Sequence, residues 1–177
     1  MLDGRRLTKG RPQGFGGFRL NVWVAIFLFL HVLGAIVAFG PVFSFPIIGA
    51  MAGKEPQHAN FAARINDLIT DQRVEPLAIF QGITCVALIL VAGIDLFASR
   101  WLIAGIVLYL IALGFALFVQ RPTGKLIVEL SSTPPPPGAS GPPPALMAAV
   151  RKAQRGGMFL TVMIVLIVLL MVVKPQF

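Results

Sequence analysis

Four long apolar runs set the pattern of this chain. No charged residue occurs between Arg19 and Lys54, and three later runs are also free of charge. About 20 apolar residues in a helix cross the hydrocarbon core of a bilayer, which is about 30 Å thick. The first run is too long for one crossing, so we expect its span to end before Gly40-Pro41. The pattern predicts transmembrane helices at about 21–39, 76–94, 101–119 and 157–173.

The segment after the first span has a helical rather than a continuous apolar pattern. Apolar side chains recur at helical spacing between residues 57 and 73, with charged side chains on the other faces. This arrangement predicts an amphipathic helix that lies in the membrane interface. The apolar positions are Phe61, Ile65, Leu68 and Ile69.

Two further segments are unlike spans. Residues 1–19 form a basic tail that contains Gly and Phe, ahead of a single membrane domain at 20–177. Pro134–Pro137 and Pro142–Pro144 supply seven of the fourteen prolines, so residues 131–144 form a Pro-rich loop. Because proline runs favour the polyproline conformation, we expect extended chain here and over the wider segment 121–156.

The amino-acid composition also indicates a membrane protein. Hydrophobic residues make up 56% of the chain and charged residues 12%, whereas soluble domains have about 45–50% and about 25%. The sequence therefore predicts an all-α polytopic membrane protein with a four-helix bundle. With Cys85 as the only cysteine, an intrachain disulfide and a cysteine metal cluster are excluded.

The net charge of +8 lies outside the apolar runs. Such charges contact anionic lipid head groups and help to set orientation, so we expect a lipid partner and no nucleic acid. Five basic residues precede the first span and three follow it, before the second. The first helix thus favours both termini on the cytoplasmic side of the membrane. A later basic cluster favours the opposite orientation: Arg121, Lys125, Arg151, Lys152 and Arg155.

His31 is the main candidate for chemistry, because it lies near the middle of the first span. Ionisable residues inside a membrane are costly and often functional. The open alternatives are a hydrogen bond across the bundle, which we favour, an axial ligand of haem b, and a proton relay. No other predicted span contains a histidine that would supply a second haem ligand.

Other polar residues near the spans have weaker signals. Gln81, Thr84, Cys85 and Tyr109 are candidates for a small polar patch between the second and third spans. Asp95 and Arg100 flank the turn between the same spans, where a solvated or paired charge is the ordinary interpretation. His58 is expected to be solvated. The chain lacks the usual catalytic signatures, so we predict no enzyme, no catalytic residue and no metal site.

Small residues indicate how the spans associate. Helices in lipid approach closely where small side chains are spaced four apart, as at Gly34 and Ala38 and at Ala112 and Ala116. The fourth span lacks this pattern. We therefore expect the first three helices to form the core and the fourth to face lipid or another subunit.

The first span also resembles a known family. Leu30-His31, Gly34 and the pair Phe39-Gly40 follow the first-helix pattern of a bacterial family of predicted four-helix integral membrane proteins of unknown function. The resemblance implies the same four-helix fold over most of the chain. It also implies a location in a bacterial inner membrane. A more distant similarity to copper-resistance-type and haem-associated membrane domains implies haem as a candidate cofactor for His31.

These features lead to three hypotheses of function. The first is a non-enzymatic accessory or assembly subunit that packs against other membrane proteins or a second copy of itself. The second is a small redox protein that binds haem b through His31. The third is an oligomeric transporter of small solutes, weakened because Asp95 is the only acidic residue close to a span apart from those of the amphipathic segment.

Overall fold

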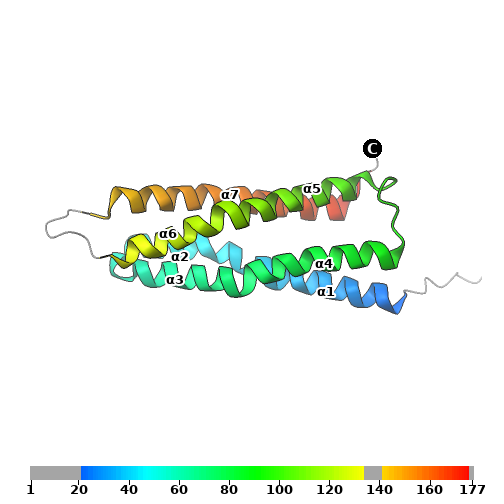
Figure 1. Cartoon of the computed structure of the whole chain (residues 1–177), viewed down its shortest axis with the longest axis horizontal. Helices are drawn as coiled ribbons and strands as arrows, with labels where there is room; N and C mark the ends of the chain where they lie inside the picture. Colours follow the sequence, from blue (N-terminus) through cyan, green and yellow to red (C-terminus); the bar gives the residue numbers. More distant parts are fainter. Residues whose placement is uncertain (1–20, 134–140, 176–177) are drawn as a thin grey trace, which may run out of the picture.

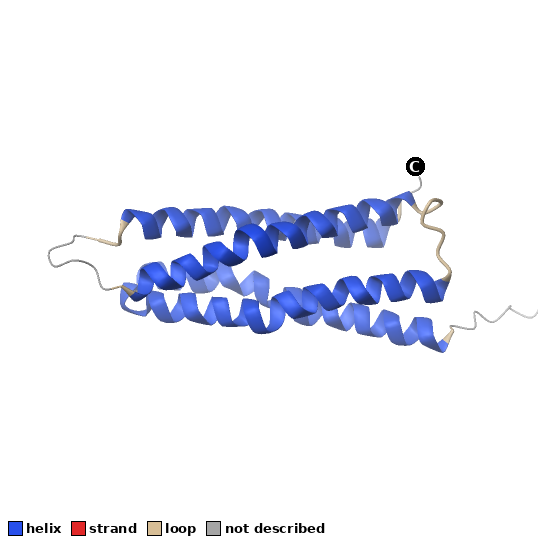
Figure 2. Cartoon of the chain, in the orientation of Figure 1, coloured by secondary structure: helices blue, strands red, loops and turns tan. Residues whose placement is uncertain are grey.

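The computed structural model describes residues 21–133 and 141–175, and every regular element in these ranges is a helix (Figure 2). The elements join into four long helices, each long and apolar enough to cross a membrane. The predicted all-α architecture with four transmembrane helices is thus confirmed. The first long helix is composed of α1 (Val22–Phe39), the 3₁₀ turn η1 (Gly40–Ser44) and α2 (Phe45–Lys54).

The second and third long helices are interrupted in the same way, whereas the fourth is regular. The second comprises η2 (Pro56–His58), α3 (Ala59–Ile69), the π-helical turn η3 (Thr70–Val74) and α4 (Glu75–Ala92). The third comprises α5 (Arg100–Phe115), the π-helical turn η4 (Ala116–Gln120) and α6 (Arg121–Ser132). The fourth is α7 (Pro144–Val173).

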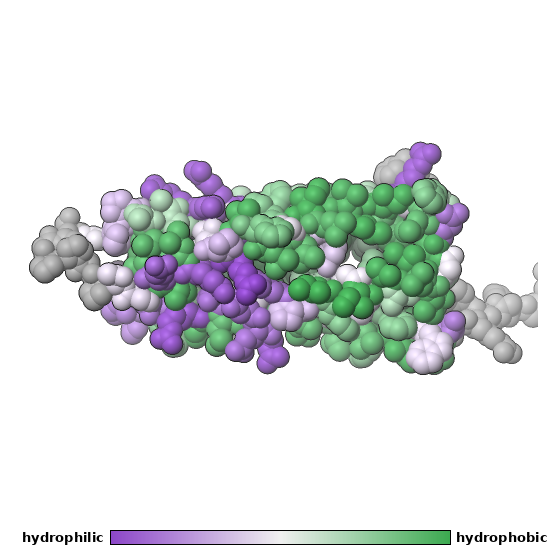
Figure 3. Space-filling model, in the orientation of Figure 1, coloured by the Kyte–Doolittle hydropathy of each residue, from purple (hydrophilic) through white to green (hydrophobic). Residues whose placement is uncertain are grey.

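The bundle is longer than a bilayer is thick. Its four helices contain 33, 37, 33 and 30 residues, which correspond to about 45–55 Å at 1.5 Å per residue. Figure 1 shows α1, α4, α5 and the end of α7 at one end of the molecule, with α2, α3 and α6 at the other. In Figure 3 hydrophobic residues cover the first end, and hydrophilic residues gather at the second. We call these ends the membrane half and the polar half.

The polar half corrects one prediction. Residues 121–156 are not extended chain throughout, because α6 and the first turns of α7 are helical. α6 packs on α3 and α7, and such tertiary contacts outweigh the weak local preference of the sequence. The connection that remains lies between Thr133 and Pro143, and residues 134–140 of the predicted Pro-rich loop are outside the described residues, as is the tail 1–19.

The predicted amphipathic segment is helical, but it is not a separate helix. α3 continues through η3 into α4. α3 therefore extends the second transmembrane helix lengthwise beyond the membrane half (Figure 1). It packs on α6 and α2, and Asn60 donates hydrogen bonds to the hydroxyls of Ser131 and Ser132. Phe61 and Leu68 nevertheless remain largely exposed.

Each interruption of helical geometry lies beside a proline. Pro41 lies within η1. Pro76 and Pro122 come after η3 and η4, with one residue between the turn and the proline in each case. Proline has no N–H and its ring collides with the carbonyl four residues earlier, which a tightened or widened turn relieves. The predicted break at Gly40-Pro41 is therefore a 3₁₀ turn. The second span was expected to begin at Pro76. Instead, the second long helix begins before Pro76 and continues through it.

The membrane half is built from two helix pairs. α1 packs along α4, and α5 packs along α7. The expectation that the first three spans form the core is wrong for α5, whose main partner is the fourth span. The close approach predicted for Gly34 and Ala38 is confirmed, since both are buried in the α1–α4 interface. Phe115 of α5 contacts Phe159 of α7, with ring centroids 4.8 Å apart.

Candidate functional site

The polar residues of the α1–α4 interface form one hydrogen-bonded network. His31 Nδ1 lies 2.9 Å from the Thr84 hydroxyl, and that hydroxyl donates to the Gln81 carbonyl at 3.0 Å. The Gln81 amide donates back across the interface to the His31 carbonyl at 2.8 Å. Of the three roles considered for His31, the hydrogen bond across the bundle is the one whose partner the structure shows.

The proton of the His31 ring and the proton of the Thr84 hydroxyl are linked. A threonine hydroxyl has one proton, and when Thr84 donates it to the Gln81 carbonyl, its oxygen accepts from His31 Nδ1. The donor and acceptor roles of the two groups follow the tautomer of the ring, and in this tautomer the lone pair of the neutral ring is on Nε2. His31 Nε2 forms no hydrogen bond with any of the described residues.

Gly34 makes this network sterically feasible. A Cβ atom at Gly34 would lie 2.9 Å from Gln81 Oε1 and 3.6 Å from the Phe80 ring. Gln81 is only 6% exposed and Thr84 2%, so both side chains are enclosed by the bundle. The Gln81 oxygen is buried without a hydrogen-bond donor within the part of the chain that the structure describes. An alanine at position 34 would therefore push the end of the Gln81 side chain from its present position.

Tyr109 links the two helix pairs. Its hydroxyl donates to the carbonyl of Ala78 on α4 at 2.7 Å, against the backbone of Gly82. The predicted polar patch of Gln81, Thr84, Cys85 and Tyr109 is thus only partly a cluster. Gln81 and Thr84 join His31, whereas Tyr109 bonds elsewhere on α4 and Cys85 is half-buried.

The remaining candidates have local roles at the ends of the bundle. Asp95 accepts hydrogen bonds from the amides of Phe97 and Ala98, at 2.9 and 3.2 Å, and so caps the turn before α5. It forms no ion pair with Arg100. His58 lies 3.9 Å from Glu55, with both side chains largely exposed.

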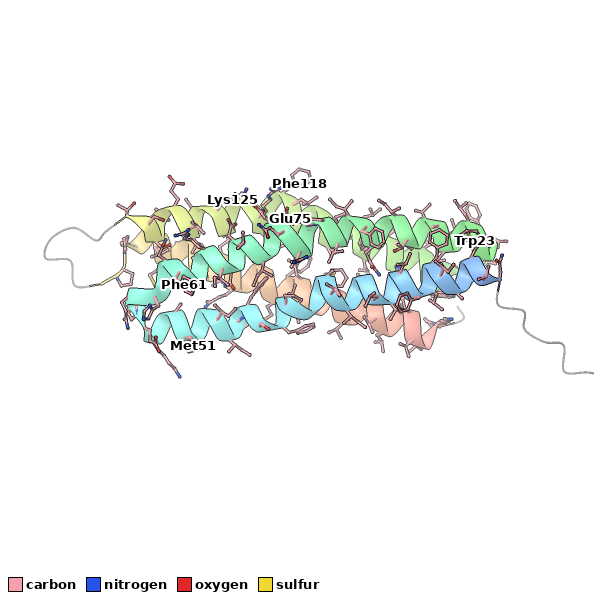
Figure 4. The ribbon with its side chains drawn as sticks, turned by 90° about the horizontal axis from the view of Figure 1, so that it is seen from below. Trp23, Met51, Phe61, Glu75, Phe118 and Lys125 are labelled. Atoms are coloured by element: carbon pink, nitrogen blue, oxygen red, sulfur yellow. The ribbon has the colours of Figure 1, made fainter. Side chains whose placement is uncertain are left out.

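A cluster of ion pairs lies at the boundary between the two halves, and the sequence analysis missed it. Arg121 Nη1 lies 3.1 Å from Glu75 Oε2, and Arg121 Nε lies 3.4 Å from Asp71 Oδ1. Lys125 Nζ lies 3.5 Å from the other oxygen of Asp71. In Figure 4 Glu75 and Lys125 lie near each other midway along the bundle. We call these four residues the ionic cluster.

The ionic cluster is partly withdrawn from water. Glu75 is 8% exposed and its Oε1 is buried with no hydrogen bond among the described residues. Burial raises the pKa of the Glu75 carboxyl above its ordinary value, and the guanidinium of Arg121 opposes this rise. Burial, followed by the negative charge of Asp71, also raises the pKa of Asp67.

The sequence contained a signal for this cluster. Asp67, Asp71 and Glu75 are spaced four apart, as are Arg121 and Lys125, so each set lies on one face of a helix. Nothing in the spacing shows that the two faces meet. That contact requires both helices to continue through Pro76 and Pro122 at the same level of the bundle.

The described residues offer little for a metal or cofactor. Within 21–133 and 141–175, no three or more His, Cys, Asp or Glu side chains are placed to hold a metal ion. His31 has Nε2 available as a single ligand, so its role toward haem stays a prediction.

Four apolar spans, buried hydrogen bonds between helices and a charged end define a polytopic helical membrane protein. A family described as "Predicted integral membrane protein (DUF2269)" matches residues 25–175. The chain belongs to this family, which confirms the suspected membership in a family of four-helix membrane proteins of unknown function. No curated protein and no solved structure matches the chain significantly.

Proposed function

We propose that this protein is a non-enzymatic accessory or assembly subunit of a larger complex in a bacterial inner membrane. The observation that carries the proposal is how the polar side chains of the membrane half are used. His31, Gln81, Thr84 and Tyr109 bind one another or the backbone of this chain, and so hold its helices together. Their hydrogen-bonding capacity stabilises the bundle, which leaves its outer surface to make external contacts.

The outer surface of α7 is the part best suited to a partner helix. Large apolar side chains stay exposed along it, with exposed fractions from 48% to 75% at Met158, Val162, Val165 and Val172. Apolar side chains gain little by leaving lipid, so association here rests on close van der Waals packing. The polar half supplies a second, water-facing surface held rigid by the ionic cluster.

The orientation forms part of the same proposal. The described ends of the chain, at α1 and at the end of α7, lie at the same end of the molecule (Figure 1). We propose that this end faces the cytoplasm, because five basic residues precede the first span. A phosphatase fused to the C-terminus should then be inactive and a fluorescent protein active. The reverse result would place the polar half in the cytoplasm.

The test of the subunit hypothesis is site-directed photo-cross-linking in native membranes. A photoreactive residue at Val165, which is 54% exposed, should give a discrete protein adduct of fixed mass. The same probe at Ala112, which is 9% exposed and lies in α5, is the matched control and should react within the chain. The isolated complex should migrate on a native gel well above the mass of one chain. Lipid adducts alone at Val165, with migration as a single chain, would refute the proposal.

Haem binding through His31 is the second candidate, favoured by one observation. When Nδ1 donates to Thr84, the free lone pair is on Nε2, which is the arrangement that an axial histidine needs. An absorption spectrum of protein purified from haem-replete cells tests it. A Soret band that disappears in His31→Ala would support haem b, whereas absence of the band in several preparations would eliminate this candidate.

A further inference from the structure

An open groove lies between the third and fourth long helices, at the boundary between the two halves. Its volume is about 540 Å³. One part is apolar, formed by Phe115, Val119 and Phe159, and the other part is the basic stretch of α7. The basic side chains that line it are Arg151, Lys152 and Arg155.

These three cations have no ion-pair partner among the described residues. All three are exposed. The other charges of the polar half balance, since five basic residues accompany five acidic ones. The basic ones are Lys54, Arg64, Arg73, Arg121 and Lys125; the acidic ones are Glu55, Asp67, Asp71, Glu75 and Glu129. The excess positive charge of this half is therefore concentrated on one wall of the groove.

The groove lies where a head group would be found. Arg155 is the last charged residue of α7 before the apolar run to Val173, and Phe159 lies one turn further into that run. Phe159 contacts Phe115, and Phe159 is four residues after Arg155. The apolar part of the groove therefore begins one helical turn from the cations. A molecule that fits must have an anionic group joined to an apolar chain.

The walls of the groove are fixed against each other. The Gln120 amide donates to the Ala153 carbonyl at 3.0 Å, which ties η4 to α7. Gly156 is buried and lies against the Gln120 side chain and the Phe115 ring. The groove is consequently formed without a ligand, and binding does not require the helices to rearrange.

We propose that this groove binds an anionic phospholipid. The phosphate contacts Arg151, Lys152 and Arg155, and an acyl chain lies along Phe115 and Phe159. Basic side chains at a membrane surface attract such head groups, and each cation near the surface adds to the attraction. The inference is independent of which partner the subunit has.

The test is native mass spectrometry of the full-length protein in detergent with added lipid. Wild-type protein should retain phosphatidylglycerol in preference to phosphatidylcholine. Replacing the three groove cations by glutamine (R151Q, K152Q, R155Q) should weaken retention at least about tenfold, since each cation contributes a severalfold factor. These side chains are exposed, so the variant should keep the thermal stability of the wild type.

Two controls separate a specific site from general charge and from a simple anion site. The variant K54Q, R64Q, R73Q removes the same charge from exposed positions of the same half and should retain lipid as the wild type does. Glycerol phosphate and inorganic phosphate, which lack acyl chains, should not displace the lipid. Equal retention by wild type and groove variant, equal loss in the control variant, or displacement by phosphate would each overturn the proposal.

Discussion

The carboxylate of Glu75 and the guanidinium of Arg121 lie 3.1 Å apart, although 45 positions separate them in the sequence. Each residue directly follows a π-helical turn and directly precedes a proline. The contact joins the second and third long helices at the level where the apolar spans end. Both side chains therefore lie at the level of the two widened turns.

We predict that Arg121→Gln lowers the free energy of unfolding by about 2 kcal/mol at neutral pH. The substitution leaves the nearly buried Glu75 carboxylate without its partner, which is costly for a buried pair. The expected loss is below that of a fully buried pair because Arg121 is 41% exposed. Denaturant titration of the purified protein in detergent measures it.

The same variant should have a characteristic pH dependence. The folded state already holds the pKa of Glu75 above its ordinary value, and loss of Arg121 raises it further, so the folded state binds a proton more readily than the unfolded state. Stability should therefore rise as the pH falls from neutral towards the ordinary value of 4.5. The double variant Glu75→Gln, Arg121→Gln should be more stable than the single one. A pH-independent deficit, unchanged in the double variant, would contradict the pairing.

The spans could be predicted from the sequence, but their continuation could not. Uncharged runs show where the chain tolerates lipid, and the four helices lie there. Charged and proline-containing flanks favour an end to the helix, yet at Pro76 and Pro122 the helices continue. The reason is tertiary: α3, α6 and the start of α7 cover one another, and this packing offsets the local cost of a widened turn.

The features of the candidate site that lie within one helix could be predicted from the sequence. His31 stood out as a polar residue in an apolar run, and Gly34 as a small one beside it. That Thr84 and Gln81 are its partners depends on the register of α1 against α4, which a single-helix pattern does not contain. The ionic cluster depends likewise on the relative height of two helices.

Adjacent glycines in α7 provide a second prediction. Gly156→Ala would place a Cβ against the Gln120 side chain, and 3.1 Å from the Phe115 ring. Gln120 must then give up its hydrogen bond to Ala153, and we expect a loss of about 1–3 kcal/mol. At Gly157 a Cβ meets nothing within 4 Å, so Gly157→Ala should be neutral or slightly stabilising. Thermal unfolding of both variants measures the difference, and equal effects would show that η4 and α7 are not packed this closely.

Thr84 provides a third prediction, about the hydrogen bond of His31. Thr84→Val removes the hydroxyl that hydrogen-bonds His31 Nδ1 inside the bundle and should cost about 1–2 kcal/mol. Thr84→Ser keeps the hydroxyl and should stay within about 0.5 kcal/mol of the wild type. If serine destabilises the protein and valine does not, the methyl group rather than the hydroxyl is what matters at this position. Denaturant titration distinguishes the two results.

Tyr109 provides the last prediction, because its hydroxyl ties one helix pair of the membrane half to the other. Tyr109→Phe removes the bond to the Ala78 carbonyl at 2.7 Å and should cost about 1 kcal/mol, as side-chain hydrogen bonds between membrane helices do. The control is Thr161→Val, whose lost hydroxyl bonds only the carbonyl of Gly157 in its own helix, and which should cost little. Unfolding in detergent should therefore begin at a lower temperature in Tyr109→Phe than in Thr161→Val. Equal midpoints for the two variants would mean that the helix pairs associate without this bond.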